Sequence, residues 1–452
     1  MQQIWARHAL VGDTWMHDVR IRIDGGRIRD VTPSVAPCGH QVGLLVPAPA
    51  NCHSHAFQRA MAGLTERRGP AADSFWTWRQ LMFRFLDRLD PDRIEAIAAF
   101  VQMEMLEAGY ACNVEFHYLH HAPGGVPYDT LAETSTRIAA AAEITGCGLT
   151  LLPVHYEFGG LDRRALGPGQ VRFGNDLDRF TRLHEGAAAA LKSLPQDTRI
   201  GVAPHSLRAV APRDLPHLRA LAGGAPFHMH LAEQPAEVDE VKAALGARPV
   251  EWVLGAVGAD ETCTFIHCTQ MEPHETLGLA ASGAVAGLCP LTEANLGDGI
   301  FDGVRWMDAG GRIAIGSDSN IRISLAEELR QLDTTQRLRD GSRAALATPE
   351  RSTGRRLMQA MAEGGAQAAG RGSGRIEAGQ WADLLALDTT HPDLSGLTGD
   401  TTLDSFVFAG GTDMVQDVWS AGRHVVTGGR HIRRDAITRT YRAAVAGLRD
   451  GI

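Results

Sequence analysis

Apolar and polar residues alternate with a period of two near both ends of the chain. Residues 18–24 place an apolar side chain at every second position and run into Gly25-Gly26, a pattern typical of a β-hairpin. Strand-like runs recur near the C-terminus, at residues 382–387, 404–408 and 415–419. Two separated β-rich ends predict one small domain built from both termini, with residues 1–47 and 376–452.

Between these ends, short apolar runs alternate with longer segments rich in alanine and leucine, such as residues 91–108 and 178–194. Eight strand-helix units predict an α/β fold, a (β/α)8 TIM-like barrel over residues 48–375. A doubly wound open sheet is the alternative, but polar residues at the ends of many strands favour a closed barrel. The expected strands are residues 44–47, 111–116, 149–154, 199–203, 227–231, 263–267, 284–289 and 312–316.

Composition narrows the class of protein. The net charge is −9, without a basic stripe, which argues against a nucleic-acid partner. No signal-peptide pattern is present, and no run approaches the roughly 18 apolar residues of a membrane helix. Seven scattered cysteines without a CxxC spacing indicate a reduced protein. We therefore expect a cytoplasmic enzyme without membrane attachment.

Histidines at the ends of predicted strands suggest a metal site. His53 and His55 are two residues apart, so they point to the same side of an extended chain. Such a pair is weak evidence alone, since 19 histidines generate about one by chance, and His228 with His230 form a second. The context is stronger, because His230 ends the fifth expected strand and Asp318 follows the eighth. Imidazole and carboxylate are usual Zn²⁺ ligands.

Two further residues at strand ends suggest proton transfer. Glu233 lies three positions after His230, where its carboxyl could carry a proton between water and a leaving nitrogen, or form a salt bridge. His267 ends the sixth expected strand, as a ligand, a hydrogen-bond donor or an electrostatic stabiliser. Together these residues predict a site that makes a nucleophile from water.

These motifs, in this order, resemble the amidohydrolase superfamily of metal-dependent hydrolases over essentially the whole chain. The resemblance implies that the small domain built from both termini is a β-sandwich beside the barrel. The resemblance implies His53, His55, His230 and Asp318 as ligands, with Glu233, His267 and Asp318 as catalytic residues. Some members bind two metals through a carbamylated lysine on strand four, but the chain has lysine only at 192 and 242, outside that strand. We therefore expect one divalent ion, zinc by resemblance, with iron or manganese as alternatives, a deaminase-type reaction, and a homodimer.

Within this superfamily the chain resembles the formimidoylglutamate deiminases. The matching stretches are residues 75–79, 115–121, 203–208, 289–299 and 316–321. The resemblance implies hydrolytic deamination of N-formimidoyl-L-glutamate to N-formyl-L-glutamate and ammonia in histidine degradation. It also implies that Gln58, Tyr118, His205 and Arg208 hold the substrate.

The chemistry of such a substrate agrees with the residues present. A dianionic amino-acid derivative requires cationic partners, and arginine offers a bidentate fork to a carboxylate. Arg208 follows the fourth expected strand, and Arg79 lies in an aromatic segment after the first, as a lid or second anchor. The alternatives are a deaminase of a purine or pterin ring, and a non-catalytic binding protein on the same fold.

Overall fold

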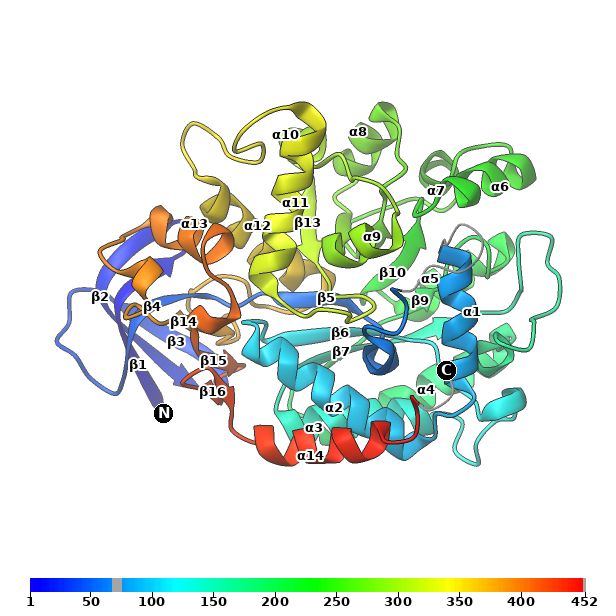
Figure 1. The fold of residues 1–452 in the computed structure, drawn as a ribbon, viewed down its shortest axis with the longest axis horizontal. Coiled ribbons are helices and arrows are strands. Elements are labelled where there is room, and N and C mark those ends of the chain that lie inside the picture. Colours follow the sequence, from blue (N-terminus) through cyan, green and yellow to red (C-terminus); the bar gives the residue numbers. More distant parts are fainter. Residues whose placement is uncertain (67–74, 450–452) are drawn as a thin grey trace.

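The structure is a computed structural model that describes residues 1–66 and 75–449, and only the backbone of residues 75–77. Strands from the two ends of the chain form a sheet on the left of Figure 1, and the middle of the chain forms a barrel on the right. Of the aromatic segment 75–79, the first three side chains lie outside the described residues.

Eight strands from both ends of the chain form the small sheet. Their order is β17-β16-β15-β14-β4-β1-β2-β3, with β1 parallel to β4 and β14 antiparallel to it. The strands are β1 (Gln2–Val11), β2 (Thr14–Asp24), β3 (Arg27–Thr32), β4 (His40–Pro47), β14 (Leu384–Leu387), β15 (Val415–Ser420), β16 (Arg423–Thr427) and β17 (Arg430–His431).

The small sheet curls around its own core. Arg27, at the start of β3, pairs with Trp381 just before β14, although β3 is an edge strand of the sheet. The enclosed side chains include Ile4, Ile21 and Trp419, all fully buried. The expected sandwich is therefore one continuous sheet folded over on itself. Its hairpin turn requires glycine at position 26, where φ is +80° and a Cβ would lie 2.7 Å from the carbonyl oxygen of residue 421.

Eight parallel strand positions form the barrel. Strands β5 to β8 form one run and β10 to β13 the other. Parallel bridges join the two runs, from Ser54 to Asp318 and from Val202 to Phe227, so the barrel closes as expected. The strands are β5 (Ala50–Ser54), β6 (Cys112–His117), β7 (Gly148–His155), the pair β8 (Arg199–Ile200) and β9 (Ala203–Pro204), β10 (Phe227–Leu231), β11 (Cys263–His267), β12 (Val285–Leu288) and β13 (Arg312–Ile315).

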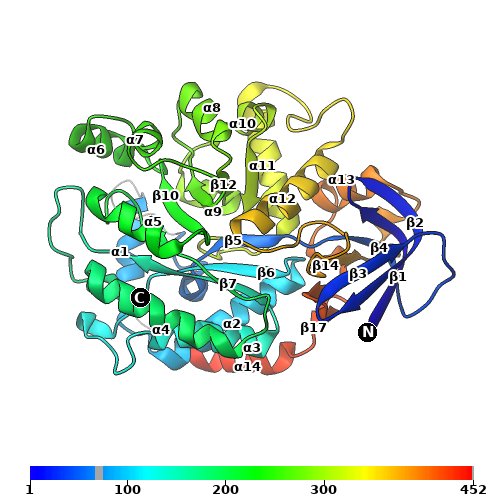
Figure 2. The same cartoon turned by 180° about the vertical axis from the view of Figure 1, so that it is seen from behind.

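Helices cover the outside of the barrel (Figure 2). Many begin with a proline, whose missing N–H costs nothing in the first turn. They are α1 (Phe75–Leu86), α2 (Pro91–Glu107), α3 (Glu133–Thr145), α4 (Leu177–Ala190), α5 (Leu215–Ala222), α6 (Pro235–Leu245), α7 (Pro249–Ala256), α8 (Pro273–Ala281), α9 (Pro290–Leu296), α10 (Gly303–Asp308), α11 (Leu325–Asp340), α12 (Thr353–Ala368), α13 (Asp400–Phe408) and α14 (Arg434–Val445). Short 3-10 helices include η1 (Ala56–Met61), η4 (Leu191–Ser193) and η5 (Pro212–Asp214).

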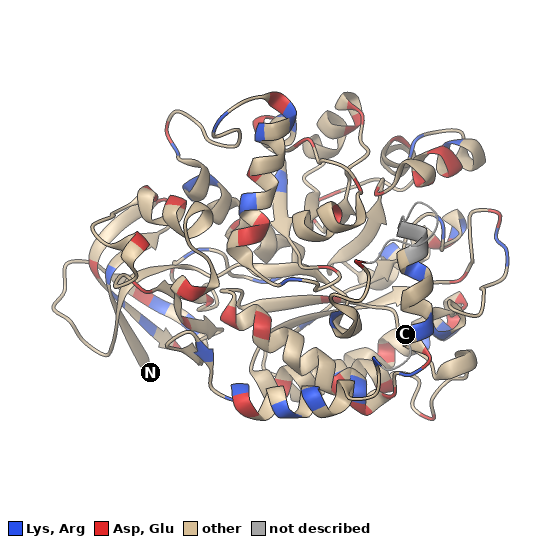
Figure 3. Ribbon diagram, in the orientation of Figure 1, with Lys and Arg blue, Asp and Glu red and all other residues tan. Residues whose placement is uncertain are grey.

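The C-terminal helix ties the end of the chain back to the barrel. Helix α14 packs on α2 below the strands in Figure 1, where the rings of Phe100 and Tyr441 stack with centroids 3.9 Å apart. Acidic and basic residues are interspersed along these outer helices (Figure 3), which agrees with the expected absence of a basic stripe. No helix among the described residues is long and apolar enough to cross a membrane, and all seven cysteines are free thiols.

Three strand predictions are wrong. Residues 44–47 belong to β4 of the small sheet, and the first barrel strand is β5, which itself carries His53. Residues 404–408 form the end of helix α13, because Leu403, Phe406 and Val407 have helical spacing and are all fully buried. The fourth barrel strand is interrupted around Gly201, where a Cβ would lie 2.3 Å from the carbonyl oxygen of residue 226.

A buried ionic network joins the two parts of the molecule. The guanidinium of Arg371 binds both carboxylate oxygens of Asp383, at 2.6 and 2.9 Å, just before β14 of the small sheet. It also contacts the carboxylate of Asp197, at 2.8 Å, just before β8 of the barrel. Arg423 on β16 binds the same Asp197 carboxylate at 2.7 and 2.8 Å. These contacts lie at the amino ends of the barrel strands. The polar residues of the predicted site lie at the opposite, carboxyl ends.

Candidate metal centre and substrate pocket

Three histidines and one aspartate meet inside the carboxyl end of the barrel. His53 lies in β5, His55 directly follows it, His230 lies in β10, and Asp318 follows β13. Their side chains are all buried, and ligand atoms of the three histidines lie within 4.8 Å of one another. The Oδ1 of Asp318 lies 3.3 Å from Nε2 of His55 and 3.6 Å from Nε2 of His53. The four predicted ligands are therefore together.

The hydrogen bonds of the histidines suit a cation at their centre. The Nδ1 of His55 donates to the carbonyl oxygen of Phe116 at 2.9 Å, and that of His230 to the carbonyl oxygen of His205 at 3.0 Å. With the proton on Nδ1, each Nε2 presents a lone pair to the cluster. The Nε2 atoms of His230 and His53 lie only 3.1 Å apart, which a shared cation would satisfy.

Burial keeps these imidazoles neutral, the form that binds metals. It lowers the pKa of His55 to about 3 and that of His53 and His230 well below the usual value. Burial also raises the pKa of the Asp318 carboxyl to about 7. The donor set, its tautomers and its burial therefore fit a divalent metal ion.

The backbone holds Asp318 in an unusual conformation. Its φ is +45°, in the left-handed region of backbone conformation that residues other than glycine seldom adopt. Two backbone hydrogen bonds to the first strand fix it there, from Asp318 N–H to the His53 carbonyl and from His55 N–H to the Asp318 carbonyl, both at 3.0 Å. Barrel closure between β5 and β13 therefore brings the carboxylate to the histidines.

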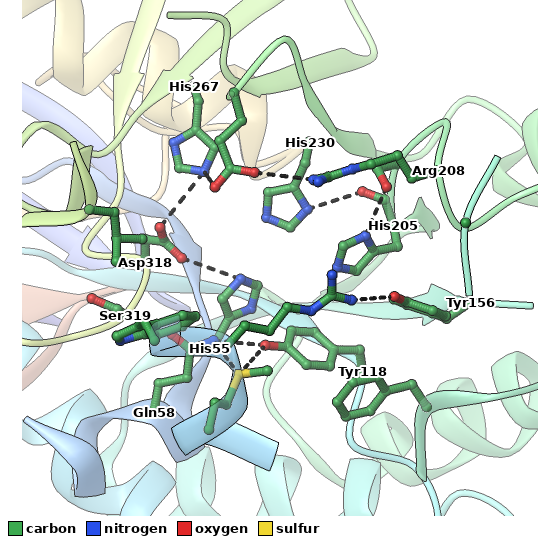
Figure 4. Close-up of a pocket in the computed structure, with 18 of the residues that line it drawn as sticks. His55, Gln58, Tyr118, Tyr156, His205, Arg208, His230, His267, Asp318 and Ser319 are labelled. Carbon is green, nitrogen blue, oxygen red and sulfur yellow. Dashed lines mark hydrogen bonds and ion pairs between the residues drawn. The ribbon is translucent and has the colours of Figure 1, made fainter. Parts of the chain in front are cut away.

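Glu233 and His267 lie beside this cluster. The Nε2 of His267 is 3.7 Å from Oδ2 of Asp318 (Figure 4) and 3.7 Å from Oε1 of Glu233. Its Nδ1 is 3.2 Å from Oε1 of Glu293. Burial alone would lower the pKa of His267, but the carboxylates of Glu233, Glu293 and Asp318 outweigh it and raise the pKa to about 10. His267 therefore places a positive charge next to the cluster.

A cavity of about 250 Å³ opens over the cluster, and all five predicted substrate residues line it. They are Gln58 on η1, Arg79 on α1, Tyr118 after β6, and His205 and Arg208 after β9. Gln58 donates from Nε2 to the hydroxyl of Tyr118 at 2.7 Å. Its Oε1 is buried and has no hydrogen-bond partner among the described residues, so it can accept an N–H from a bound molecule.

Two arginines give this cavity its positive side. The Nη2 of Arg208 contacts Oε2 of Glu233 at 3.5 Å, and both side chains are almost fully buried. The Nη2 of Arg79 donates to the hydroxyl of Tyr156 at 2.7 Å, and both residues line the cavity. His205 lies between them, with burial holding its pKa well below the usual value. The cavity therefore suits an anionic molecule that reaches the metal cluster.

Sequence reasoning missed Tyr156 and Glu293. Tyr156 directly follows β7, so the rule that strand ends carry site residues could have identified it. Glu293 lies within the stretch 289–299 but was given no role, because only the fold brings it to His267. Only one histidine of the second His-x-His pair joins the cluster, because the Nε2 of His228 donates to the carbonyl oxygen of Ala368 at 2.8 Å.

A closed barrel with a buried cluster of metal-type ligands, and a buried glutamate beside it at the carboxyl end, is typical of a metal-dependent hydrolase. Residues 44–425 match the model of the amidohydrolase family, and the chain belongs to that family. Residues 1–41 match the N-terminal domain of formimidoylglutamate deiminase HutF. Over the full length of both chains the protein is 43% identical to formimidoylglutamate deiminase of Pseudomonas aeruginosa, which places it among the formimidoylglutamate deiminases.

Solved structures agree with this placement. An amidohydrolase from Brucella melitensis superposes with a TM-score of 0.95 and 45% identity, over 99% of this chain and all of the other. An adenosine deaminase from Xanthomonas campestris with bound zinc shares the fold, with a TM-score of 0.82 and 21% identity over 99% and 98% of the two chains. A 5-methylthioadenosine/S-adenosylhomocysteine deaminase of Natronomonas pharaonis is 28% identical, with 88% of this chain and 84% of the relative covered.

Proposed function

We propose that this protein hydrolyses N-formimidoyl-L-glutamate to N-formyl-L-glutamate and ammonia, a reaction of histidine degradation. The family of the chain supports this function. One observation supports this particular substrate: Arg208 lies 3.5 Å from Glu233. In formimidoylglutamate the α-carboxylate is only three bonds from the formimidoyl carbon. A carboxylate held by Arg208 therefore leaves the formimidoyl group beside Glu233 and the metal cluster.

His53, His55, His230 and Asp318 would hold a single divalent ion, which we propose is Zn²⁺. When bound, such an ion lowers the pKa of a coordinated water and so supplies a nucleophile at neutral pH. The two lysines support a mononuclear barrel site, since Lys192 lies in η4 and Lys242 in α6. Neither is on a barrel strand, where a carbamylated lysine would bridge two ions.

The remaining chemistry belongs to side chains around the cavity. The Glu233 carboxylate takes a proton from the attacking water and passes it to the terminal formimidoyl nitrogen as the water oxygen bonds to the formimidoyl carbon. His267 faces the cluster with its positive charge and stabilises the tetrahedral species. Asp318 takes the remaining proton of that water from the new hydroxyl and returns it to the terminal nitrogen. The C–N bond to this nitrogen then breaks, ammonia leaves, and the hydroxyl oxygen becomes the formyl carbonyl.

The other residues of the cavity would bind the two carboxylates of the substrate and the N–H between its formimidoyl carbon and its Cα. Arg208 binds the carboxylate nearer the reacting carbon, and Arg79, with Tyr156, binds the second. His205 and Tyr118 contribute hydrogen bonds along the chain of the substrate. The unpaired Oε1 of Gln58 accepts the substrate N–H. Each of these assignments places a donor or acceptor against the complementary group of the substrate.

Deamination of a purine or pterin ring is the rival function, since several relatives are named as deaminases of such rings. The cavity does contain aromatic side chains, among them Trp78, Tyr118 and Phe173. A neutral ring, however, would offer no carboxylate to the two arginines that line the cavity. Arg208 and Arg79 therefore favour formimidoylglutamate.

Ammonia release tests the proposal directly. We expect rapid release from N-formimidoyl-L-glutamate and none from guanine, 5-methylthioadenosine or isoxanthopterin. Turnover of a ring without turnover of formimidoylglutamate would replace the proposal with the rival function. Removal of metal by a chelator should abolish activity, and added Zn²⁺ should restore it. Activity that survived complete removal of metal would contradict the metal-dependent mechanism. Light scattering of the same sample tests the expected homodimer.

A further inference from the structure

A second group of metal-type ligands lies on the small sheet, far from the barrel site in the fold. It consists of His40 at the start of β4, Asp417 on β15 and His424 on β16, and we name it the sheet cluster. Strands β4 and β15 are not neighbours, because β14 lies between them. The cluster therefore forms only because the sheet curls and brings the beginning of β4 over β15 and β16.

Local strand geometry places two of these residues on the same face. Trp419 pairs directly with His424 across β15 and β16, and its ring stacks on the imidazole with centroids 4.4 Å apart. Asp417 is two residues before Trp419 and so points to the same side of the strand. A bulge between Val418 and Trp419 shifts the register and turns His424 toward the aspartate.

The ligand atoms are spaced as a metal site requires. The Nε2 of His424 lies 2.8 Å from Oδ1 of Asp417, and the Nε2 of His40 lies 3.4 Å from Oδ2. Tetrahedral zinc with bonds of about 2.0–2.1 Å places its ligand atoms about 3.4 Å apart. The rings of His40 and His424 meet edge to face with centroids 4.8 Å apart. Small side-chain rotations are therefore enough for all three to reach one ion.

Burial and charge also favour a cation. The Asp417 side chain is 3% exposed, and its ion pairs among the described residues are with the two histidines alone. A buried carboxylate without an arginine or lysine is costly unless another cation balances it. The His40 and His424 side chains are 38% and 24% exposed, so an ion and a water ligand can reach the cluster from solvent.

We propose that the sheet cluster is a second divalent-metal site, a His-His-Asp zinc site with water as the fourth ligand. It would hold the beginning of β4 against β15 and β16, and so join segments from the two ends of the chain. Its role is structural, because the small sheet carries none of the residues that line the substrate cavity. A metal that binds only the folded sheet raises the stability of the protein.

Zinc binding to the intact, tag-free protein tests this proposal. The protein is stripped of metal, equilibrated with zinc buffered in the low micromolar range, and its bound zinc is measured per chain. The variants Asp417→Asn and His424→Gln remove sheet-cluster ligands, whereas His230→Asn removes a barrel ligand. His274→Gln is the matched control, because His274 forms an exposed pair with Glu251 at 2.8 Å but belongs to neither cluster.

We expect two zinc ions per chain in the wild type and in His274→Gln, and one in each of the other variants. The rise in Tm on adding zinc should persist in His230→Asn and shrink in the sheet-cluster variants. If Asp417→Asn does not fold, the half-exposed His40→Gln serves in its place. Unchanged zinc content in the sheet-cluster variants would overturn the proposal and leave a His-Asp-His hydrogen-bonded group. The proposal would also be overturned if the wild type bound one zinc ion per chain and His230→Asn bound none.

Discussion

Replacing Glu233 with glutamine separates proton transfer from binding. The substitution keeps the size of the side chain. It also keeps an oxygen that can accept a hydrogen bond from Arg208, which lies 3.5 Å from Glu233 in the wild type. It removes the negative charge 3.7 Å from His267 and the ability to carry a proton. Glu233 is outside the four predicted ligands, so the metal content should equal that of the wild type.

The size of the effect follows from the role assigned to Glu233. A positioned general acid–base contributes about 100- to 10,000-fold to the rate, which corresponds to about 3–5 kcal/mol of activation free energy. We therefore expect kcat for Glu233→Gln to fall by about that factor. KM should change far less, since the substrate still meets Arg208. The pKa of His267 should also fall, because the Glu233 carboxylate helps to raise it.

Steady-state ammonia release measures kcat and KM, and NMR of the imidazole follows the titration of His267. Glu240→Gln is the matched control, since Glu240 borders the cavity on helix α6 without a contact to His267, and should stay close to wild type. A Glu233→Gln enzyme with near-wild-type kcat and normal metal content would refute the assignment of Glu233 as the proton carrier.

Three other changes test binding, stability and pH dependence. Arg208→Gln should lower kcat/KM about 10- to 150-fold by removing one charge-assisted bond of about 1.5–3 kcal/mol, and an unchanged KM would contradict its role. Arg371→Met should lower the free energy of unfolding by about 3–5 kcal/mol, because it leaves the buried Asp383 without its arginine and Asp197 with Arg423 alone. Denaturant unfolding would show this loss, and a loss below about 1 kcal/mol would argue against it. Burial raises the pKa of Glu115 from 4.5 to about 7, so the folded state favours the protonated carboxyl, and the stability should fall as pH rises from about 4.5 to about 7. Glu115→Gln should flatten that part of the pH profile, and an identical profile in the variant would exclude Glu115 as its source.

Some site residues could be identified from the sequence because they directly follow apolar, strand-like runs. His230, Glu233, His267 and Asp318 follow apolar runs, and parallel barrel strands all end at the same rim. The first strand was misplaced because residues 44–47 form an apolar run, whereas the true barrel strand, residues 50–54, reads Ala-Asn-Cys-His-Ser. An apolar pattern therefore favours the run that joins the small sheet over the polar strand that enters the barrel.

The histidine pairs show the same limit at the level of single side chains. His53 and His55 both face the cluster, whereas only His230 of the second pair contributes, because His228 hydrogen-bonds the carbonyl oxygen of Ala368. Nothing local distinguishes these pairs. Glu293 likewise contacts His267 only in the folded chain, because helix α9, which follows β12, places its carboxylate beside that imidazole.

The sequence by itself determined the kinds of residue, their order and their positions at strand ends, because those depend on local periodicity and chemistry. These were enough for the barrel, the metal-dependent class and the family. Tertiary structure decided which of those residues meet. His53 and His230 are 177 positions apart, yet barrel closure sets their Nε2 atoms 3.1 Å from each other. Curling of the small sheet likewise assembles His40 with Asp417 and His424, since contacts between distant segments depend on how whole elements pack.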